Sequence, residues 1–252
     1  MTVGAGPQRE DADIESSSAM YARRFAGPVG KWFVDHQAHL TLQCLAGLPR
    51  GATVLDVGGG HAQLAPPLIE AGLDVTIIGS DPSCGERLAP LTAARRCRFE
   101  VGDLQALPYA DQSFDAVTCY RLIAHSIDWR HLVAELCRVA RHRVIVDYPA
   151  RRSVNFASHA LFTIKHSIER GTTRPFALYG RGEVARAFQD AGFAVTAVRP
   201  QFLLPMALYR LLGSAGAARA AEGIARSLGL TALLGSPVIA RADRRPTPGG
   251  PS

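Results

Sequence analysis

The sequence has no apolar run long enough to cross a membrane. Its longest stretch without a charged residue or histidine covers 14 residues, 227–240, and is interrupted by two glycines and a proline. A spanning helix needs ~20 predominantly apolar residues. The first 25 residues are polar and acidic, whereas a signal peptide has an apolar central segment. We therefore expect a cytoplasmic protein without a transmembrane helix.

Cysteine is scarce and irregularly spaced, with five residues in 252 and no C-x-x-C pair. An odd number of isolated cysteines fits neither a zinc cluster nor a disulfide framework. Small buried thiols are the simpler interpretation, and we expect no metal site. The cysteines are Cys44, Cys84, Cys97, Cys119 and Cys137.

Lysine is almost absent, because Lys31 and Lys165 are the only two among 28 basic residues. The formal net charge of +6 therefore rests on arginines, which are scattered along the chain except for short pairs. A nucleic-acid surface would cluster its basic residues and interleave aromatics. We interpret the arginines as a solvated exterior and expect no nucleic-acid partner. With 47% apolar and 20% charged residues, the composition is that of a folded globular chain.

The two ends of the chain have little to bury. Residues 1–16 are mostly polar or small and residues 243–252 are rich in proline and glycine, so we expect both segments to be disordered. Between 19 and 45 apolar residues recur at helical spacing, interrupted by a Gly-Pro pair and a further glycine. Residues 17–49 are therefore expected to form an N-terminal helical cap of two short helices, and residues 50–242 the main domain.

From residue 52 onward, short β-rich runs alternate with helical ones. The β-rich runs are apolar throughout rather than at every second residue, which is typical of strands in a parallel sheet covered on both faces. We predict a doubly wound, Rossmann-like α/β fold with a mostly parallel seven-stranded sheet and helices on both faces. The predicted strands are 52–57, 74–79, 98–101, 114–119, 144–147, 193–198 and 237–242. The predicted helices are 61–71, 86–94, 129–142 and 182–191.

A glycine-rich turn follows the first strand, with Gly58 and Gly60 in a G-x-G pattern. Such a turn brings bare backbone and a helix N-terminus against a ligand at the carboxyl end of the strand. A dinucleotide fingerprint would need a third glycine, and Ala62 and Gln63 stand in its place. Asp56, two positions before the first glycine, is ill suited to a pyrophosphate but can accept a proton from an ammonium group. A partly cationic, nucleotide-like cofactor is therefore expected.

This segment resembles the first motif of the class I S-adenosylmethionine-dependent methyltransferases, a hydrophobic strand followed by an acid and G-x-G. After the second strand comes Asp81, and the resemblance implies that this acid holds the ribose diol of S-adenosylmethionine. It comes one or two residues later than usual, which leaves Ser80 as a competing ribose contact. After the third strand, Asp103 is similar to the acid that accepts the adenine amino group. The resemblance assigns Leu104 and Tyr120 to the cofactor as well.

Later segments extend the resemblance. Residues 107–117 are similar to the family's LP-F-x-D-x-S-F-D-x-V run, in which we interpret Asp115 as structural because it begins a strand. His125 follows ten residues further on, where many members carry a histidine, and it is the candidate catalytic base. Residues 183–195 resemble the family's late helix, Gly-Phe turn and strand. All of these motifs occur in the family's order.

The acceptor of the methyl group is less closely defined. No Asn/Asp-Pro-Pro-Tyr tetrad follows the fourth strand, where Thr-Cys-Tyr-Arg stands instead, and this disfavours amino-methylation of DNA or RNA. Inserted segments at about 151–180 and 201–232 follow the fifth and sixth strands and contain apolar stripes. We expect them to form helical lids over a largely apolar acceptor such as a quinone, polyketide, aromatic or lipid-like compound. Arg121, Arg151 or Arg152 is available for an acidic group.

The expected function is transfer of a methyl group from S-adenosylmethionine to a small, largely apolar molecule. Oxygen is the favoured acceptor atom, with His125 taking its proton, while carbon and nitrogen stay open. Two alternatives also stay open: a non-catalytic S-adenosylmethionine-binding partner or regulatory subunit, and an RNA methyltransferase. An amphipathic lid would also permit peripheral membrane contact.

Overall fold

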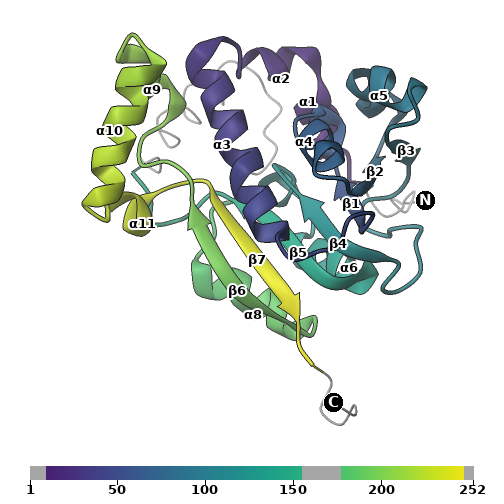
Figure 1. Ribbon diagram of the computed structural model, residues 1–252. Helices are drawn as coiled ribbons and strands as arrows, with labels where there is room; N and C mark the ends of the chain where they lie inside the picture. The colour runs from purple at the N-terminus through teal and green to yellow at the C-terminus, as the bar shows by residue number, and fades with distance from the viewer. Residues whose placement is uncertain (1–9, 155–176, 247–252) are drawn as a thin grey trace, which may run out of the picture.

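A computed structural model describes residues 10–154 and 177–246 of the chain. Its centre is a seven-stranded sheet in the order β3-β2-β1-β4-β5-β7-β6. The strands β3, β2, β1, β4 and β5 are parallel to one another, and β7 lies antiparallel between β5 and β6 (Figure 1). The predicted doubly wound, mostly parallel sheet is confirmed. The strands are β1 (Thr53–Val57), β2 (Asp74–Gly79), β3 (Arg98–Val101), β4 (Phe114–Cys119), β5 (Ala140–Tyr148), β6 (Phe193–Pro200) and β7 (Val238–Arg244).

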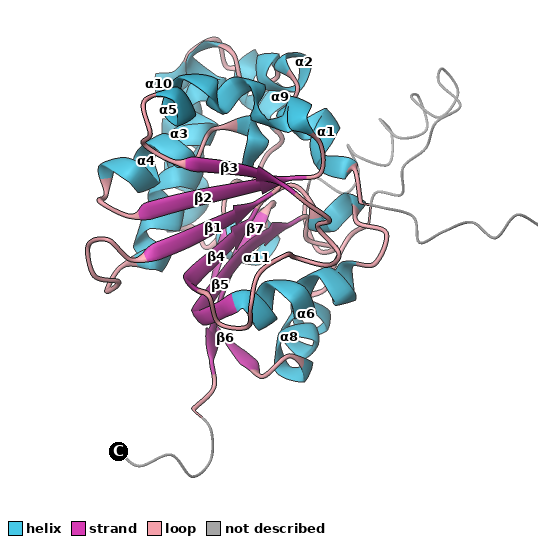
Figure 2. Ribbon diagram, turned by 90° about the vertical axis from the view of Figure 1, so that its right-hand side faces the viewer, coloured by secondary structure: helices cyan, strands magenta, loops and turns pink. Residues whose placement is uncertain are grey.

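Helices cover both faces of the sheet (Figure 2). The α-helices are α1 (Ala12–Ser17), α2 (Ala19–Arg23), α3 (Gly27–Leu45), α4 (Ala65–Glu70), α5 (Ala89–Ala93), α6 (Trp129–Val139), α8 (Arg181–Asp190), α9 (Met206–Leu211), α10 (Ala215–Ser227) and α11 (Leu230–Leu234). Three 3₁₀ segments, η1 (Gly59–His61), η2 (Pro82–Leu88) and η3 (Ile123–His125), follow β1, β2 and β4.

The strands β1, β2 and β4 are buried because they are apolar on both sides, whereas the edge strand β3 is largely exposed. In β1, Leu55 and Val57 belong to the core cluster that contains residues of α6 and α8, whereas Val54 belongs to the cluster that contains residues of α3 and α4. All three side chains are fully buried. Because β1, β2, β3, β4 and β5 run parallel, their carboxyl ends lie at one edge of the sheet, where open α/β folds bind their ligands.

Several helices differ in extent from their predictions; α5, for example, covers Ala89–Ala93 rather than 86–94, because η2 extends to Leu88. The cap contains one short helix, α2, and one helix of 19 residues, α3, rather than two short ones. Pro28 lies in the first turn of α3, where its missing N–H breaks no helical hydrogen bond. Helix α4 begins at Ala65 rather than at 61 because η1 precedes it. Helix α6 ends at Val139, since Ala140 already pairs with Phe114 of β4.

The prediction of disordered ends is wrong where the structure describes them. Residues 12–17, predicted to lie almost entirely in a disordered N-terminus, form helix α1, and β7 extends to Arg244. Helix α1 has few apolar residues, and its buried residues include Asp13, Ser16 and Ser17. Their burial depends on polar contacts with distant parts of the chain, which local composition does not reveal.

The two predicted lid insertions differ in how much of each is described. Most of the first lies at 155–176, outside the described residues. The second contains α9, α10 and α11; helices α9 and α10 lie beside α3, and α11 lies against β6 (Figure 1). Phe33 of α3 stacks on Phe202 with ring centroids 3.7 Å apart, and Trp32 packs edge-on against Phe202 and Tyr209. These rings fix the second insertion against the helical cap.

Candidate cofactor and acceptor site

The glycine-rich turn lies at the carboxyl end of β1. Gly58 has a left-handed φ of +71°, a conformation that favours glycine, and η1 follows directly. At Gly60 a Cβ atom would lie 2.3 Å from both the Cys84 carbonyl oxygen and Ser17 Oγ. No side chain fits there. The atoms that exclude a side chain here belong to the protein, and the predicted close approach of this backbone to a ligand stays a prediction.

Asp56 lies buried beneath this turn, with 2% of its surface exposed. Its Oδ1 accepts a hydrogen bond of 2.7 Å from Thr118 Oγ1 on β4. Burial raises the pKa of Asp56 from 3.8 to about 7, although the Thr118 hydrogen bond and the charge of Arg121 act in the opposite direction. A carboxylate held at this cost is suited to a cationic partner.

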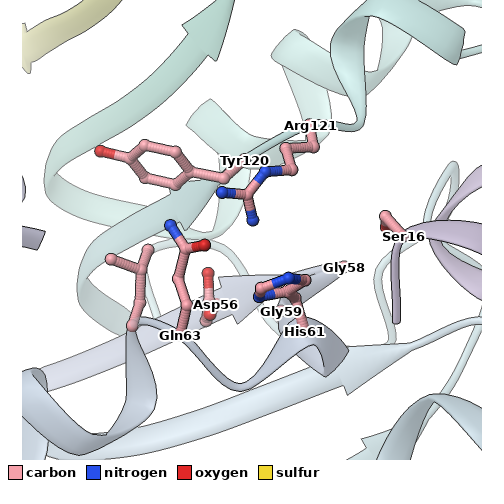
Figure 3. Close-up of a pocket in the computed structure, with 9 residues that line it drawn as sticks. Ser16, Asp56, Gly58, Gly59, His61, Gln63, Tyr120 and Arg121 are labelled. Atoms are coloured by element: carbon pink, nitrogen blue, oxygen red, sulfur yellow. The ribbon is translucent and has the colours of Figure 1, made fainter. Parts of the chain in front are cut away.

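A small pocket opens above Asp56 (Figure 3). Its volume is about 10 Å³, which is room for roughly one water molecule. Both ring nitrogens of His61 and Oε1 of Gln63 are buried here without a hydrogen-bond partner among the described residues. Burial lowers the pKa of His61 to about 3, so the ring is neutral. The lining residues are Ser16, Asp56, Gly58, Gly59, His61, Gln63, Leu64, Tyr120 and Arg121.

Arg121 faces this pocket from the loop after β4 (Figure 3). Its guanidinium carbon lies 4.6 Å from the centroid of the Phe25 ring, and Nη2 donates a 2.9 Å hydrogen bond to Gln37 Oε1. In the described part of the chain this guanidinium forms no ion pair. Tyr120, its neighbour, is buried and its hydroxyl lies 2.6 Å from Thr41 Oγ1 of α3. The pocket thus combines a buried acid with an arginine that can bind a carboxylate.

The predicted ribose and adenine residues lie at the ends of β2 and β3. Asp81 caps η2 by accepting hydrogen bonds from the amide and hydroxyl of Ser83. Asp103 is partly exposed and accepts a 2.9 Å hydrogen bond from the Gln105 amide, while Leu104 is fully buried. The structure therefore brings these residues to the same edge of the sheet as the glycine-rich turn.

Helix α1 lies in the space between these residues. Asp13 accepts hydrogen bonds from the Ser80 amide, at 2.8 Å, and from the Ser80 hydroxyl. Glu10, just before the helix, accepts a 2.9 Å hydrogen bond from the Ile127 amide and one of 3.2 Å from Gln105 Nε2. The competing ribose contact, Ser80, is thus bound to Asp13 in this conformation.

A second, larger cavity of about 470 Å³ adjoins the pocket, and Arg121 lines both. Asp147, at the end of β5, lies in its wall and accepts hydrogen bonds from the Arg121 amide at 2.6 Å and Gln37 Nε2 at 3.1 Å. Burial raises the pKa of Asp147. His125, in η3, also lines this cavity. The remaining lining residues are Tyr21, Arg24, Phe25, Phe33, Ala124, Tyr148, Pro149, Gln201, Phe202, Leu204, Pro205, Met206, Arg210, Ser236 and Pro237.

Asp115 has the structural role expected of it. Its carboxylate accepts hydrogen bonds from the Thr53 amide and hydroxyl, at 2.8 and 3.0 Å, and pairs with Arg141 at 2.6 Å. It therefore joins the starts of β1, β4 and β5, at the end of the sheet opposite the pocket. All five cysteines are buried free thiols.

The described residues contain neither a candidate metal site nor a candidate membrane-spanning helix. Residues 10–154 and 177–246 contain no group of three His, Cys, Asp or Glu side chains that could hold a metal ion. The same residues contain no helix that is long and apolar enough to cross a membrane.

Comparisons with known proteins agree with this geometry. Residues 55–146 match the methyltransferase domain family. A demethylmenaquinone methyltransferase of Deinococcus radiodurans is 34% identical over 135 residues, which is 51% of this chain and 55% of that protein. The chain spans about half the length of the curated relatives it matches.

Solved structures extend the likeness over the whole fold. The magnesium protoporphyrin IX methyltransferase of Synechocystis PCC 6803, solved with bound S-adenosylhomocysteine, has a TM-score of 0.62 at 18% identity, with 93% of this chain and 98% of that chain covered. A chain of the complex between the Haloferax volcanii Trm112 methyltransferase activator and a methyltransferase has a TM-score of 0.63 at 18% identity, with 96% and 100% covered. Residues 55–146 therefore resemble a methyltransferase domain in sequence, and the chain as a whole has the fold of these class I methyltransferases.

The cofactor of this family is S-adenosylmethionine, and the framework around the turn suits it. The close backbone at Gly60, the buried acid Asp56 and the unpartnered polar atoms of His61 and Gln63 match a ligand with an amino-acid end. The pocket of about 10 Å³ is nevertheless far too small for the whole molecule, because α1 fills the rest of the crevice. The framework residues fit the methyltransferase cofactor, and α1 stands where the rest of it would extend.

Sequence reasoning missed three contributors to the site. Asp13 carries no local signal, since it lies in a polar segment without helical periodicity. Gln37 lies on a helix whose other buried residues are mostly apolar or small, and nothing marks it as a pocket residue. Asp147 offered the best signal, because it is an acid at the carboxyl end of a central strand.

Proposed function

We propose that this class I methyltransferase transfers the methyl group of S-adenosylmethionine to a small, largely apolar acceptor that carries an acidic group. The observation that carries the proposal is the cavity of about 470 Å³ next to the glycine-rich pocket, with Arg121 in the wall of both. A donor bound over the turn would meet an acceptor bound in the cavity. Such juxtaposition supplies most of what methyl transfer requires.

The lining of the cavity supports this acceptor class. Phe25, Phe33, Phe202 and Met206 offer an apolar surface for a hydrocarbon or aromatic body. Besides Arg121, which we assign to the methionine carboxylate of the cofactor, Arg24 and Arg210 line the cavity, and the carboxylate of Asp147 already accepts two hydrogen bonds. An anionic group on the acceptor would be favoured by these two arginines.

The residues that would hold the cofactor follow from the pocket. Asp56 is suited to the ammonium group and Arg121 to the carboxylate of the methionine part, while Gly58 and Gly60 allow close approach of the backbone. Asp103, Leu104 and either Ser80 or Asp81 are assigned to the nucleoside. Tyr120 braces the wall against Thr41 of α3. When bound, the cofactor supplies an electrophilic methyl group on a sulfonium centre.

Oxygen is the acceptor atom that we favour, with His125 as its base. His125 lies in the cavity wall, and an imidazole can act as a general base toward a hydroxyl group as that oxygen becomes methylated. Asp147 is assigned a different task, because its two hydrogen bonds hold Gln37 and the backbone of Arg121 in place. His125 is therefore assigned to the acceptor, and Asp147 positions the residues of the cavity wall.

The test is turnover of methyl-labelled S-adenosylmethionine with matched acceptors. Aromatic, quinonoid and prenyl-type compounds would each be supplied as an acid and as its neutral amide, beside total RNA, and products would be identified by mass. We expect methylated product from hydroxylated apolar acids and little from their amides. Labelling of RNA would favour the RNA methyltransferase alternative. Cofactor binding without any product would favour the non-catalytic alternative.

A further inference from the structure

Helix α1 is bound in the cofactor crevice through side chains that are almost completely buried. Glu10 and Asp13 are each 1% exposed and Ser17 is 4% exposed. These three residues contact the ends of β1, β2, β3 and β4 in turn: Ser17 lies at Gly60, Asp13 at Ser80, and Glu10 at Gln105 and Ile127. The contacts therefore extend along the whole crevice.

The groups that α1 occupies are those assigned to the cofactor. Ser80 is one of the two residues proposed to contact the ribose, the other being Asp81. The amide and the hydroxyl of Ser80 both donate hydrogen bonds to Asp13. Asp13 also accepts a 3.3 Å hydrogen bond from Cys84 Sγ. Gln105 follows directly after Asp103 and Leu104, the assigned adenine residues, and its side chain binds Glu10. One crevice cannot accommodate both this segment and an adenosyl group.

We propose that residues 10–17 and S-adenosylmethionine are mutually exclusive occupants of the crevice, so that the N-terminal segment must leave before the cofactor binds. The inference rests on the proposed function. It makes the segment an intramolecular competitor whose affinity for the crevice sets the apparent affinity for the cofactor. When only a fraction of the molecules has an open crevice, the apparent dissociation constant rises by the inverse of that fraction.

The segment is built in a way that permits displacement. Helix α1 has six residues, and so short a helix is unstable without its contacts. Its two buried carboxylates have no arginine, lysine or histidine partner among the described residues, and they are held by amide, hydroxyl, thiol and side-chain amide donors. Burying carboxylates without a cation offsets much of the gain from these bonds. The net free energy that binds the segment to the crevice is therefore small, and a ligand can displace the segment.

The direct test is calorimetric titration with S-adenosylhomocysteine, the demethylated cofactor. Asp13→Ala removes the bonds to Ser80 and Cys84 and is expected to lower the dissociation constant roughly tenfold, since a hydrogen bond to a charged group has about that effect. Glu15→Ala is the matched control, because Glu15 lies on the same helix but is exposed and pairs with Arg24. It should leave the affinity unchanged.

Amide hydrogen exchange of the wild-type chain gives an independent readout that does not depend on a variant. We expect the amides of residues 10–17 to exchange faster when S-adenosylhomocysteine is bound than when it is absent. Weaker binding by Asp13→Ala, or undiminished protection of these amides in the complex, would overturn the inference while leaving the proposed function intact. Absence of any binding by wild type and Asp13→Ala alike would contradict the proposed function and, with it, the inference.

Discussion

The assignment of Arg121 to the methionine carboxylate can be tested by comparing two ligands that differ in that group. Arg121→Met removes the guanidinium but keeps a long apolar side chain that can pack on Phe25, and it leaves the backbone amide that donates to Asp147. In the described part of the chain the guanidinium has one hydrogen bond, to Gln37, and no ion pair. Several of its donors are therefore directed at the pocket rather than at protein partners.

The size of the effect follows from the kind of bond. A hydrogen bond between charged groups contributes about 1.5–3 kcal/mol. Its loss should raise the dissociation constant of S-adenosylhomocysteine roughly 10- to 100-fold. The ligand 5′-methylthioadenosine lacks the amino-acid end, so its affinity should change little. Displacement of α1 affects both ligands alike and cancels in the ratio of the two dissociation constants.

Calorimetric titration of both ligands into wild type, Arg121→Met and Arg151→Met completes the experiment. Arg151 is a suitable control because it is exposed, pairs with Glu183 and lines neither the pocket nor the cavity. An equal loss of affinity for both ligands would mean that Arg121 only supports the fold of the loop. No loss for either ligand would refute its assignment to the carboxylate.

Three further variants test other parts of the site. Asp56→Asn should stabilise the ligand-free chain at pH 8, because the raised pKa of Asp56 in the folded state makes its ionised carboxylate cost up to about 4 kcal/mol of stability there. This cost falls as the pH drops from about 7 towards 3.8, so urea unfolding should show a smaller gain in stability at pH 5 than at pH 8. An equal gain at both pH values would contradict the role of ionisation. Gly60→Val should abolish S-adenosylhomocysteine binding, because the valine Cβ would lie 2.3 Å from the Cys84 carbonyl oxygen and the turn would have to shift. Circular dichroism should still report an α/β fold. Retained binding would show that the turn is only a connector. His125→Ala should lower turnover at least roughly tenfold while the affinity for S-adenosylhomocysteine stays the same, and full turnover would point to an acceptor that needs no base at that position.

The sheet was predictable because its strands are defined by local sequence. Strands β2, β3 and β4 begin and end at the predicted residues. Strands β2 and β4 are short runs rich in apolar and β-branched residues, and in β3 charged and apolar residues alternate. The glycine-rich turn was equally predictable from the sequence, because glycine is required where the backbone packs as closely as it does at Gly60. These features depend on residues that are close together in the chain.

Other features depend on contacts between distant residues, and sequence patterns do not encode those directly. Helix α1 is ordered by bonds from Asp13 to residues 67 and 71 positions away. The cavity wall joins Gln37 to Asp147 across 110 positions. Each of these contacts requires the finished fold.

A crystal structure of the wild-type chain with S-adenosylhomocysteine bound would show whether the ligand replaces the N-terminal segment in the crevice. We predict that the amino-acid end of the ligand lies between Asp56 and Arg121, that its adenine lies beside Asp103 and Leu104, and that residues 10–17 have left the crevice. A ligand bound elsewhere on the chain, or a crevice that still contains α1 at saturating ligand, would contradict it.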